Sequence, residues 1–154
     1  MIFWLFALGT LIVDQLTKYI VRINMRELES IPLIREVFHL TYILNPGAAF
    51  GMLAYKTVFF IVMAIVVIGG VIIYNHRLSG EQLVLRIALG LQVGGAIGNL
   101  IDRVRFAHVV DFLDFRVFPV FNFADTAITV GVGLLILEIL RQNKLNQADN
   151  TGGN

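Results

Sequence analysis

Four long apolar runs alternate with shorter polar segments along the chain. The runs cover about residues 2–23, 57–74, 82–101 and 121–140. Because about 20 mostly apolar residues are enough to cross a bilayer as a helix, the pattern predicts an all-α integral membrane protein. Its single domain should have four transmembrane helices. The second and third runs are separated only by the short polar turn of residues 75–81, so these two spans should be antiparallel neighbours.

The segment between the first two spans, residues 24–56, is too polar to be a span. Within it, residues 38–44 (FHLTYIL) are rich in β-branched and aromatic side chains, which is typical of a short strand. An Asn-Pro-Gly turn follows at Asn45. We therefore expect residues 24–56 to form a small β-containing cap on one face of the membrane.

An even number of spans places both chain termini on one side of the membrane. The cap and a second exposed segment, residues 103–119, then share the other side. Residues 141–154 form a polar tail that is expected to be disordered. The first run has no basic segment before it and no A-x-A site after it. We expect it to be a retained span and not a cleaved signal peptide.

Composition supports the membrane assignment and excludes several kinds of chemistry. Hydrophobic residues make up 57% of the 154 and charged residues 15%, whereas soluble domains average about 45–50% and about 25%. The net charge of +1 gives no sign of nucleic-acid binding. The chain has no cysteine, and its three histidines are scattered. No disulfide, thiolate catalysis, Cys-based metal site or zinc site is therefore expected.

A few charged and small residues interrupt the spans. Asp14 and Lys18 are four positions apart, so they share a helix face. They are either an ion pair that makes two buried charges tolerable or a brace for a nearby site. Glu138 is expected to snorkel or to pair with Arg141. Glycines in the third span should let helices approach closely; they are Gly90, Gly94, Gly95 and Gly98.

Most of the aspartates gather in one stretch, residues 94–130. It holds four of the six in the chain, which are Asp102, Asp111, Asp114 and Asp125. Carboxylates near the ends of membrane helices are costly unless they are paired, hydrated or used. Arg103 is placed either to pair with Asp102 or to hold a substrate carbonyl. Asp114 is expected to be a solvated loop charge.

Peptide hydrolysis needs an activated nucleophile, and the residue types leave few choices. Neither of the two serines, Ser30 and Ser79, has a histidine or lysine suitably placed in the sequence. Two carboxylates are chemically sufficient, because an ionised one draws a proton from water while a neutral one protonates the leaving amine. We interpret Asp111 and Asp125 as such a pair. The sequence does not assign the two roles.

Two non-enzymatic alternatives also fit an acid cluster in a membrane protein. A small transporter or channel subunit would use intramembrane carboxylates for protons or cations. The acids here lie at helix ends on one face, and the four spans show no internal repeat, which argues against that plan. A membrane assembly factor would explain the glycines but would leave the acids unexplained.

Five motifs in the chain resemble those of the bacterial lipoprotein signal peptidases, the signal peptidase II family. They are DQLTK from Asp14, NPGAAFG from Asn45, GGAIGNLIDR from Gly94, VVDF from Val109 and FNFADTAITVG from Phe121. The motifs follow the family's order and spacing over nearly the whole chain.

The resemblance implies a role for each motif position. Asp111 and Asp125 would be the catalytic dyad. The substrate-contacting residues would be Asn45, Gly47, Asn99, Arg103 and Asn122. The supporting positions would be Asp14, Lys18 and Asp102.

The resemblance also implies a substrate, partners and a location. The substrate would be a prolipoprotein cut before a cysteine that carries diacylglycerol, with no metal or cofactor. Membrane lipids and globomycin-type inhibitors would be further partners. The protein would lie in the bacterial inner membrane, with cytoplasmic termini and an extracytoplasmic cap and active site. Counting arginines and lysines alone would instead place the cap in the cytoplasm.

Overall fold

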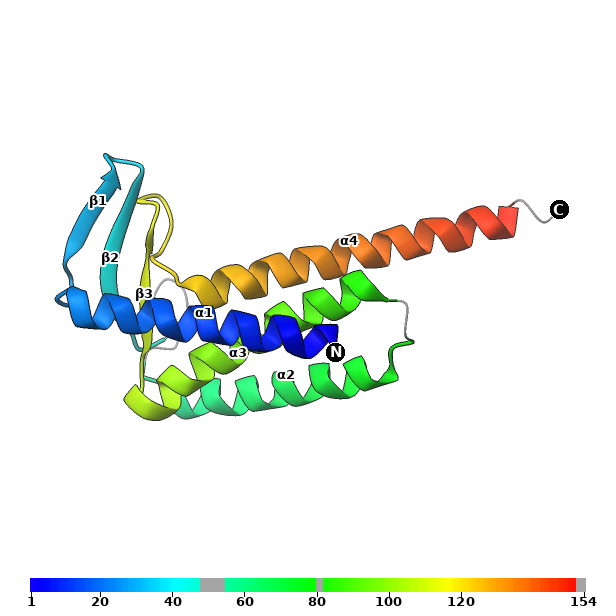
Figure 1. The fold of residues 1–154 in the computed structure, drawn as a ribbon, viewed down its shortest axis with the longest axis horizontal. Coiled ribbons are helices and arrows are strands. Elements are labelled where there is room, and N and C mark those ends of the chain that lie inside the picture. Colours follow the sequence, from blue (N-terminus) through cyan, green and yellow to red (C-terminus); the bar gives the residue numbers. More distant parts are fainter. Residues whose placement is uncertain (48–54, 80–81, 152–154) are drawn as a thin grey trace.

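The computed structural model describes residues 1–47, 55–79 and 82–151. Within these ranges the chain forms four helices and a three-stranded sheet (Figure 1). The helices are α1 (Ile2–Asn24), α2 (Thr57–Arg77), α3 (Leu83–Phe106) and α4 (Phe123–Thr151). The strands are β1 (Ser30–Ile34), β2 (Phe38–Asn45) and β3 (Val109–Asp114).

All four helices are long and apolar enough to cross a membrane, which confirms the four predicted spans. Both termini lie at one end of the bundle and the sheet lies at the other (Figure 1). The expected disordered tail is wrong as far as Thr151, because α4 continues to that residue. Its last turns contain good helix formers such as Gln, Lys, Leu and Ala, and no glycine or proline interrupts them before Gly152.

Helix α3 is the centre of the bundle. Half of the most apolar stretch of α3 is buried inside the protein, whereas none of the corresponding stretch of α2 is buried. The glycines of α3 allow this packing, as predicted. A Cβ atom at Gly90 would lie 2.6 Å from the Phe3 carbonyl oxygen of α1, and one at Gly95 would lie 2.6 Å from the Ala124 carbonyl oxygen of α4. Larger residues at these positions would push the helices apart.

The strands form one antiparallel sheet in the order β1-β2-β3. Strand β2 confirms the strand that the sequence predicted in residues 38–44. Strand β3 comes from the second exposed segment, so the cap is built from both loops on that side. Residues 48–51 of the NPGAAFG motif lie outside the described residues.

One face of the sheet rests on the end of α1. Val21 of α1 forms a buried cluster with Tyr42 of β2 and with Val110 and Phe112 of β3. The pairing of β2 with β3 shifts register between Leu40 and Ile43. Beyond this irregularity, Ile43 pairs with Asp111 and Asn45 pairs with Val109. This pairing brings the polar residues Asn45 and Asp111 together at the sheet end of the helix bundle.

Candidate active site

Asp111 is a buried carboxylate in the middle of β3. Its side chain is only 2% exposed. One oxygen accepts a hydrogen bond from Asn45 Nδ2 of β2 at 2.8 Å, and the other accepts one from Asn122 Nδ2 at 2.7 Å. Two amide donors therefore fix the orientation of the carboxyl group.

Asp125 lies in the first turn of α4. The Asp125 backbone N–H donates to Asn122 Oδ1 at 3.0 Å, and Asp125 Oδ2 accepts from the Asn122 backbone N–H at 3.3 Å. This reciprocal arrangement is a capping box. It explains why the helix begins here, and it places a carboxylate where the helix dipole favours negative charge.

Asparagine side chains connect the two carboxylates. Asn99 Nδ2 of α3 donates to Asp125 at 2.8 Å. Asn122 Nδ2 contacts both Asp111 and Asn99 Oδ1, the latter at 3.2 Å. Lys18 Nζ also donates to Asn99 Oδ1, at 2.8 Å. Because an ammonium group has no acceptor, Lys18 sets the amide of Asn99 with its NH₂ toward Asp125.

Burial and a neighbouring charge change the acidity of Asp111. Loss of solvent is the largest cause, and the nearby negative charge of Asp125 is the second; together they raise the pKa of Asp111 from 3.8 to about 7. Hydrogen bonds from Asn45 and Asn122 act in the opposite direction. The site therefore disfavours two ionised carboxylates at neutral pH.

Both aspartates border a cavity of about 260 Å³. Its polar lining includes Asn45, Gly47, Asn99 and Arg103, and its apolar lining includes Val109, Phe118, Pro119, Val120 and Phe121. Arg103 Nη2 donates to the Gly47 carbonyl at 3.2 Å, and its guanidinium lies 4.8 Å from the centre of the Phe60 ring. The carboxyl pair thus faces a space that is partly polar and partly apolar.

A buried cluster of charged side chains lies next to the two aspartates and their asparagines, on the side of the helix bundle. Lys18 Nζ lies 2.9 Å from Asp14 Oδ2 and 3.0 Å from Asp102 Oδ2. Asp14 Oδ1 accepts from the Ala124 backbone N–H at 2.9 Å, and Asp102 Oδ2 accepts from the Val110 backbone N–H at 3.2 Å. The cluster therefore ties α1 and α3 to the start of α4 and to β3.

Comparison with known sequences identifies the family. The sequence profile of signal peptidase (SPase) II matches residues 6–141. The chain belongs to the signal peptidase II family. The prediction made from its five motifs is confirmed.

Individual relatives in this family cover nearly the whole chain. The lipoprotein signal peptidase of Halothermothrix orenii is 47% identical over 142 residues, which are 92% of this chain and 97% of that protein. The one of Moorella thermoacetica is 50% identical over 138 residues, which are 90% of this chain and 92% of that protein.

Two solved structures share the fold. The first, described as a bacterial membrane enzyme at 2.3 Å resolution, has a TM-score of 0.86 and 36% identity, with 90% of this chain and 87% of that chain covered. The second, a bacterial membrane enzyme at 1.9 Å resolution, has a TM-score of 0.81 and 36% identity, with 88% and 90% covered.

The structure brings together the residues that the signal peptidase II motifs singled out. All five expected substrate-contacting residues either line the cavity or bridge the two aspartates. The three supporting positions form the buried cluster next to them. The choice left open for Arg103 is resolved in part, because Asp102 pairs with Lys18 while Arg103 contacts a backbone carbonyl.

Two acidic residues outside the pair have clear partners. The expectation that Asp114 is a solvated loop charge is wrong. Asp114 is the last residue of β3 and is 4% exposed. Its carboxylate accepts hydrogen bonds from Thr41 at 2.7 Å and from Arg116 at 3.0 Å. Burial alone would raise the pKa of Asp114, but these donors and the charge of Arg116 outweigh it and lower the pKa. Glu138 pairs with Arg141 at 3.0 Å, which confirms that expectation.

Sequence reasoning missed two contributors. Gln15 Nε2 lies 3.2 Å from Asp14, from Asp102 and from the Gly98 carbonyl, so it completes the buried cluster. Its place inside the DQLTK motif was a usable signal. Thr129 lines the cavity one helical turn after Asp125, where i,i+4 spacing would have placed it. In the part of the chain that the structure describes, no three His, Asp or Glu side chains are placed to hold a metal ion.

Proposed function

We propose that this protein is an aspartic endopeptidase that removes signal peptides from diacylglyceryl-modified prolipoproteins, cutting before the lipidated cysteine. The observation that carries the proposal is the pair Asp111 and Asp125, held by shared asparagines at the edge of one cavity. Membership of the signal peptidase II family supports the same activity.

The surroundings of the two carboxylates favour different protonation states. Asp125 lies at the N-terminus of α4, where the helix dipole stabilises a negative charge. Asp111 lies buried in a strand next to that charge. Asp125 is therefore the base and Asp111 is the acid, and the pair shares one proton.

The reaction follows from that division of roles. Asp125 takes a proton from water, and the oxygen of that water attacks the scissile carbonyl carbon. Asp111 donates its proton to the carbonyl oxygen as the tetrahedral intermediate forms. When the C–N bond breaks, Asp125 gives the proton that it took from water to the leaving amine. Asp111 takes back the proton from the hydroxyl of the intermediate, and the new carboxyl group is released. Arg103 and the asparagines are placed to hold the substrate backbone during these steps.

An apolar groove next to the pair suits a lipid-modified peptide. It has a volume of about 420 Å³ and is lined mainly by Phe115, Phe118, Phe121 and Val130. Asp125 borders both the groove and the polar cavity. An acyl chain or an apolar segment of the signal peptide in this groove would bring the scissile bond to the carboxylates.

We propose that the protein lies in the inner membrane with both termini in the cytoplasm and with the sheet at the outer leaflet. The excess of arginine on the sheet side does not count fully against it, because several of these charges are engaged within the protein. Arg22 lies 3.9 Å and Arg105 5.0 Å from the centre of the Phe106 ring. Arg116 pairs with Asp114. Family membership, and not the charge count, supports this orientation.

The activity is tested by incubating the purified protein with a diacylglyceryl-modified prolipoprotein in the presence of a chelator. We expect one cut before the lipidated cysteine, at the same rate with the chelator as without it. The same substrate without its lipid should be cut far more slowly, because the apolar groove then remains unfilled. A well-folded protein that cuts neither substrate would refute the proposal, and loss of cleavage with chelator would refute the metal-independent mechanism.

The acidity of Asp111 predicts a pH profile. Asp111 must be protonated to act as the acid, so activity is present below its pKa and is lost as the pH rises through about 7. Asn45→Ala removes a hydrogen bond that stabilises the ionised form, which raises the pKa further. We therefore expect kcat/KM to decline above pH about 7 in the parent and at a higher pH in Asn45→Ala.

Thr41→Val is the matched control for that profile. Thr41 lies in the same strand and donates to Asp114 in the same way that Asn45 donates to Asp111. In Thr41→Val, kcat/KM should decline above the same pH as in the parent. An unchanged pH of decline in Asn45→Ala, or an equal displacement in Thr41→Val, would contradict the assignment of Asp111 as the acid.

A further inference from the structure

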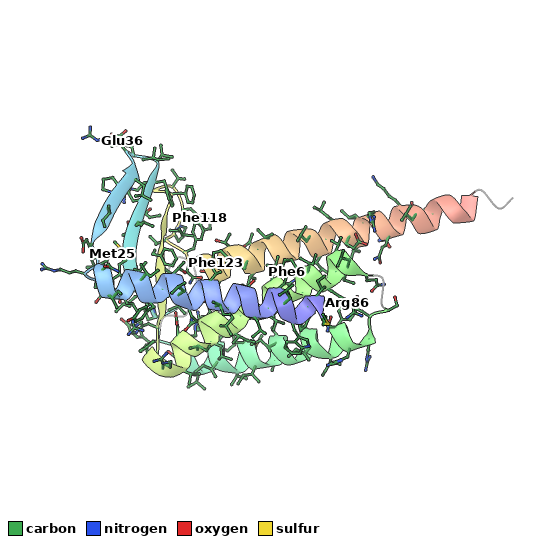
Figure 2. All side chains as sticks on the ribbon, viewed as in Figure 1. Phe6, Met25, Glu36, Arg86, Phe118 and Phe123 are labelled. Carbon is green, nitrogen blue, oxygen red and sulfur yellow. The ribbon has the colours of Figure 1, made fainter. Side chains whose placement is uncertain are left out.

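A separate pocket lies at the far end of the sheet, away from the aspartate pair. This tip pocket is lined by Pro32, Arg35, Glu36, His39 and Arg116 and has a volume of about 360 Å³. Figure 2 shows Glu36 at the tip of the hairpin between β1 and β2, which extends to one side at the sheet end of the helix bundle. The proposed peptidase reaction uses none of these side chains.

A directed chain of hydrogen bonds fixes the proton of His39. Thr41 Oγ1 donates to the Asp114 carboxylate at 2.7 Å, so its proton is committed. Ser30 Oγ, 2.8 Å from Thr41 Oγ1, must then donate to Thr41. Ser30 has no second proton, so its oxygen accepts from His39 Nδ1 at 3.1 Å. The proton of a neutral His39 is therefore on Nδ1.

This leaves the other ring nitrogen of His39 as an acceptor without a donor. His39 Nε2 is buried and has no hydrogen-bond partner in the described structure. A buried polar atom without a partner is costly. His39 lines the tip pocket, but Nε2 itself has no exposed surface. A ligand in the pocket that donates an N–H or O–H would therefore satisfy it only after a small turn of the imidazole ring.

The charges around the tip pocket nearly balance. Arg116 Nη1 lies 3.0 Å from Asp114 Oδ2, so that guanidinium is already paired. Within the described residues, neither Arg35 nor Glu36 forms an ion pair within 4 Å. Glu36 is also held at a φ of 60°, a left-handed conformation that is uncommon for a residue with a side chain. One free cation and one free anion fit a zwitterion better than a simple anion.

The position of the tip pocket points to lipid. Helix α1 has 23 residues, which corresponds to about 35 Å, whereas the hydrocarbon core of a bilayer is about 30 Å thick. The sheet at the helix ends therefore lies at the depth of the lipid headgroups. Exposed apolar side chains flank the pocket, among them Ile34, Val37 and Val117, the last 93% exposed.

We propose that the tip pocket binds the headgroup of a phospholipid that carries a primary ammonium. The phosphate contacts Arg35 and Arg116, and the ammonium contacts Glu36. After a small turn of the His39 ring, the ammonium also donates to Nε2. The flanking apolar residues contact the upper part of the acyl chains. A quaternary ammonium has no N–H to donate, so phosphatidylcholine is the matched lipid that lacks the deciding group.

The test measures which lipid remains bound to the purified full-length protein. The protein is exchanged into detergent with equal amounts of dioleoyl phosphatidylethanolamine and dioleoyl phosphatidylcholine, and retained lipid is counted by native mass spectrometry. We expect phosphatidylethanolamine to exceed phosphatidylcholine by at least about fivefold. Glu36→Gln and His39→Phe should each bring this ratio close to one while cleavage activity stays unchanged. Arg35→Gln removes a contact to the phosphate that both lipids carry, so it should lower the retention of both.

Arg26→Gln and free phosphoethanolamine are the controls. Arg26 is an exposed arginine at the opposite end of the sheet, outside the tip pocket, so its replacement should leave the ratio unchanged. Displacement of the lipid by an equal concentration of phosphoethanolamine would overturn the lipid source in favour of a soluble ligand. The proposal is overturned if the two lipids bind equally, if phosphatidylglycerol binds better, or if the Glu36 and His39 variants keep the preference.

Discussion

The variants Asp111→Asn and Asp125→Asn should each cleave prolipoprotein at least about a thousandfold more slowly than the parent. Each change keeps the shape of the side chain but removes its ability to carry or accept the shared proton. Because the two carboxylates act as one unit, the double variant should be no slower than the slower single variant. The measurement is the single-turnover rate on a diacylglyceryl-modified substrate.

Asp114→Asn provides a close control for this loss. Asp114 lies in the same strand as Asp111, is similarly buried, and also accepts several hydrogen bonds. Its replacement therefore produces a comparable structural disturbance without touching the pair. Cleavage by Asp114→Asn should stay within about threefold of the parent. Full activity in Asp111→Asn or Asp125→Asn, or an equal loss in Asp114→Asn, would show that the pair does not perform the chemistry.

Hydrophobic periodicity and local turn signals were enough to predict the spans and strand β2. The four apolar runs have few competing interpretations, because a bilayer requires long helices. The same signals could not show β1, which is exposed along its whole length and contains Pro32. It is a strand because it pairs with β2, and such pairing leaves little trace in the sequence of one edge strand.

The residues of the site were predictable, but their arrangement was not. The motifs contain Asn99, Asn122 and the two aspartates, yet nothing local indicates that Asn122 caps α4 and bridges both carboxylates. Asp14 contacts the backbone of Ala124, which is 110 positions away. Contacts at such separation depend on helix packing, and this explains why Asp114 was assigned to solvent although it is buried.

Replacing Lys18 with methionine should cause the largest loss of stability. Lys18 is 2% exposed and contacts the carboxylates of both Asp14 and Asp102. Methionine has a similar length but leaves two buried carboxylates without their cation, which costs about 3–5 kcal/mol. Asn99 also loses the donor that orients its amide toward Asp125. We expect earlier unfolding in a denaturant titration of the detergent-solubilised protein, and a cleavage rate at least about tenfold lower where the variant is folded.

The double variant Lys18→Met with Asp102→Asn separates charge from packing. In Lys18→Met the carboxylates of Asp14 and Asp102 are left without a cation. The added Asp102→Asn change removes one of these two charges with little change in side-chain volume, so the double variant should be more stable than Lys18→Met alone. Lys56→Met, at an exposed lysine next to α2, should change stability by less than about 0.5 kcal/mol. If Lys18→Met unfolded together with the parent, or if the double variant were the less stable one, the buried cluster would not hold α1, α3, α4 and β3 together through its charges.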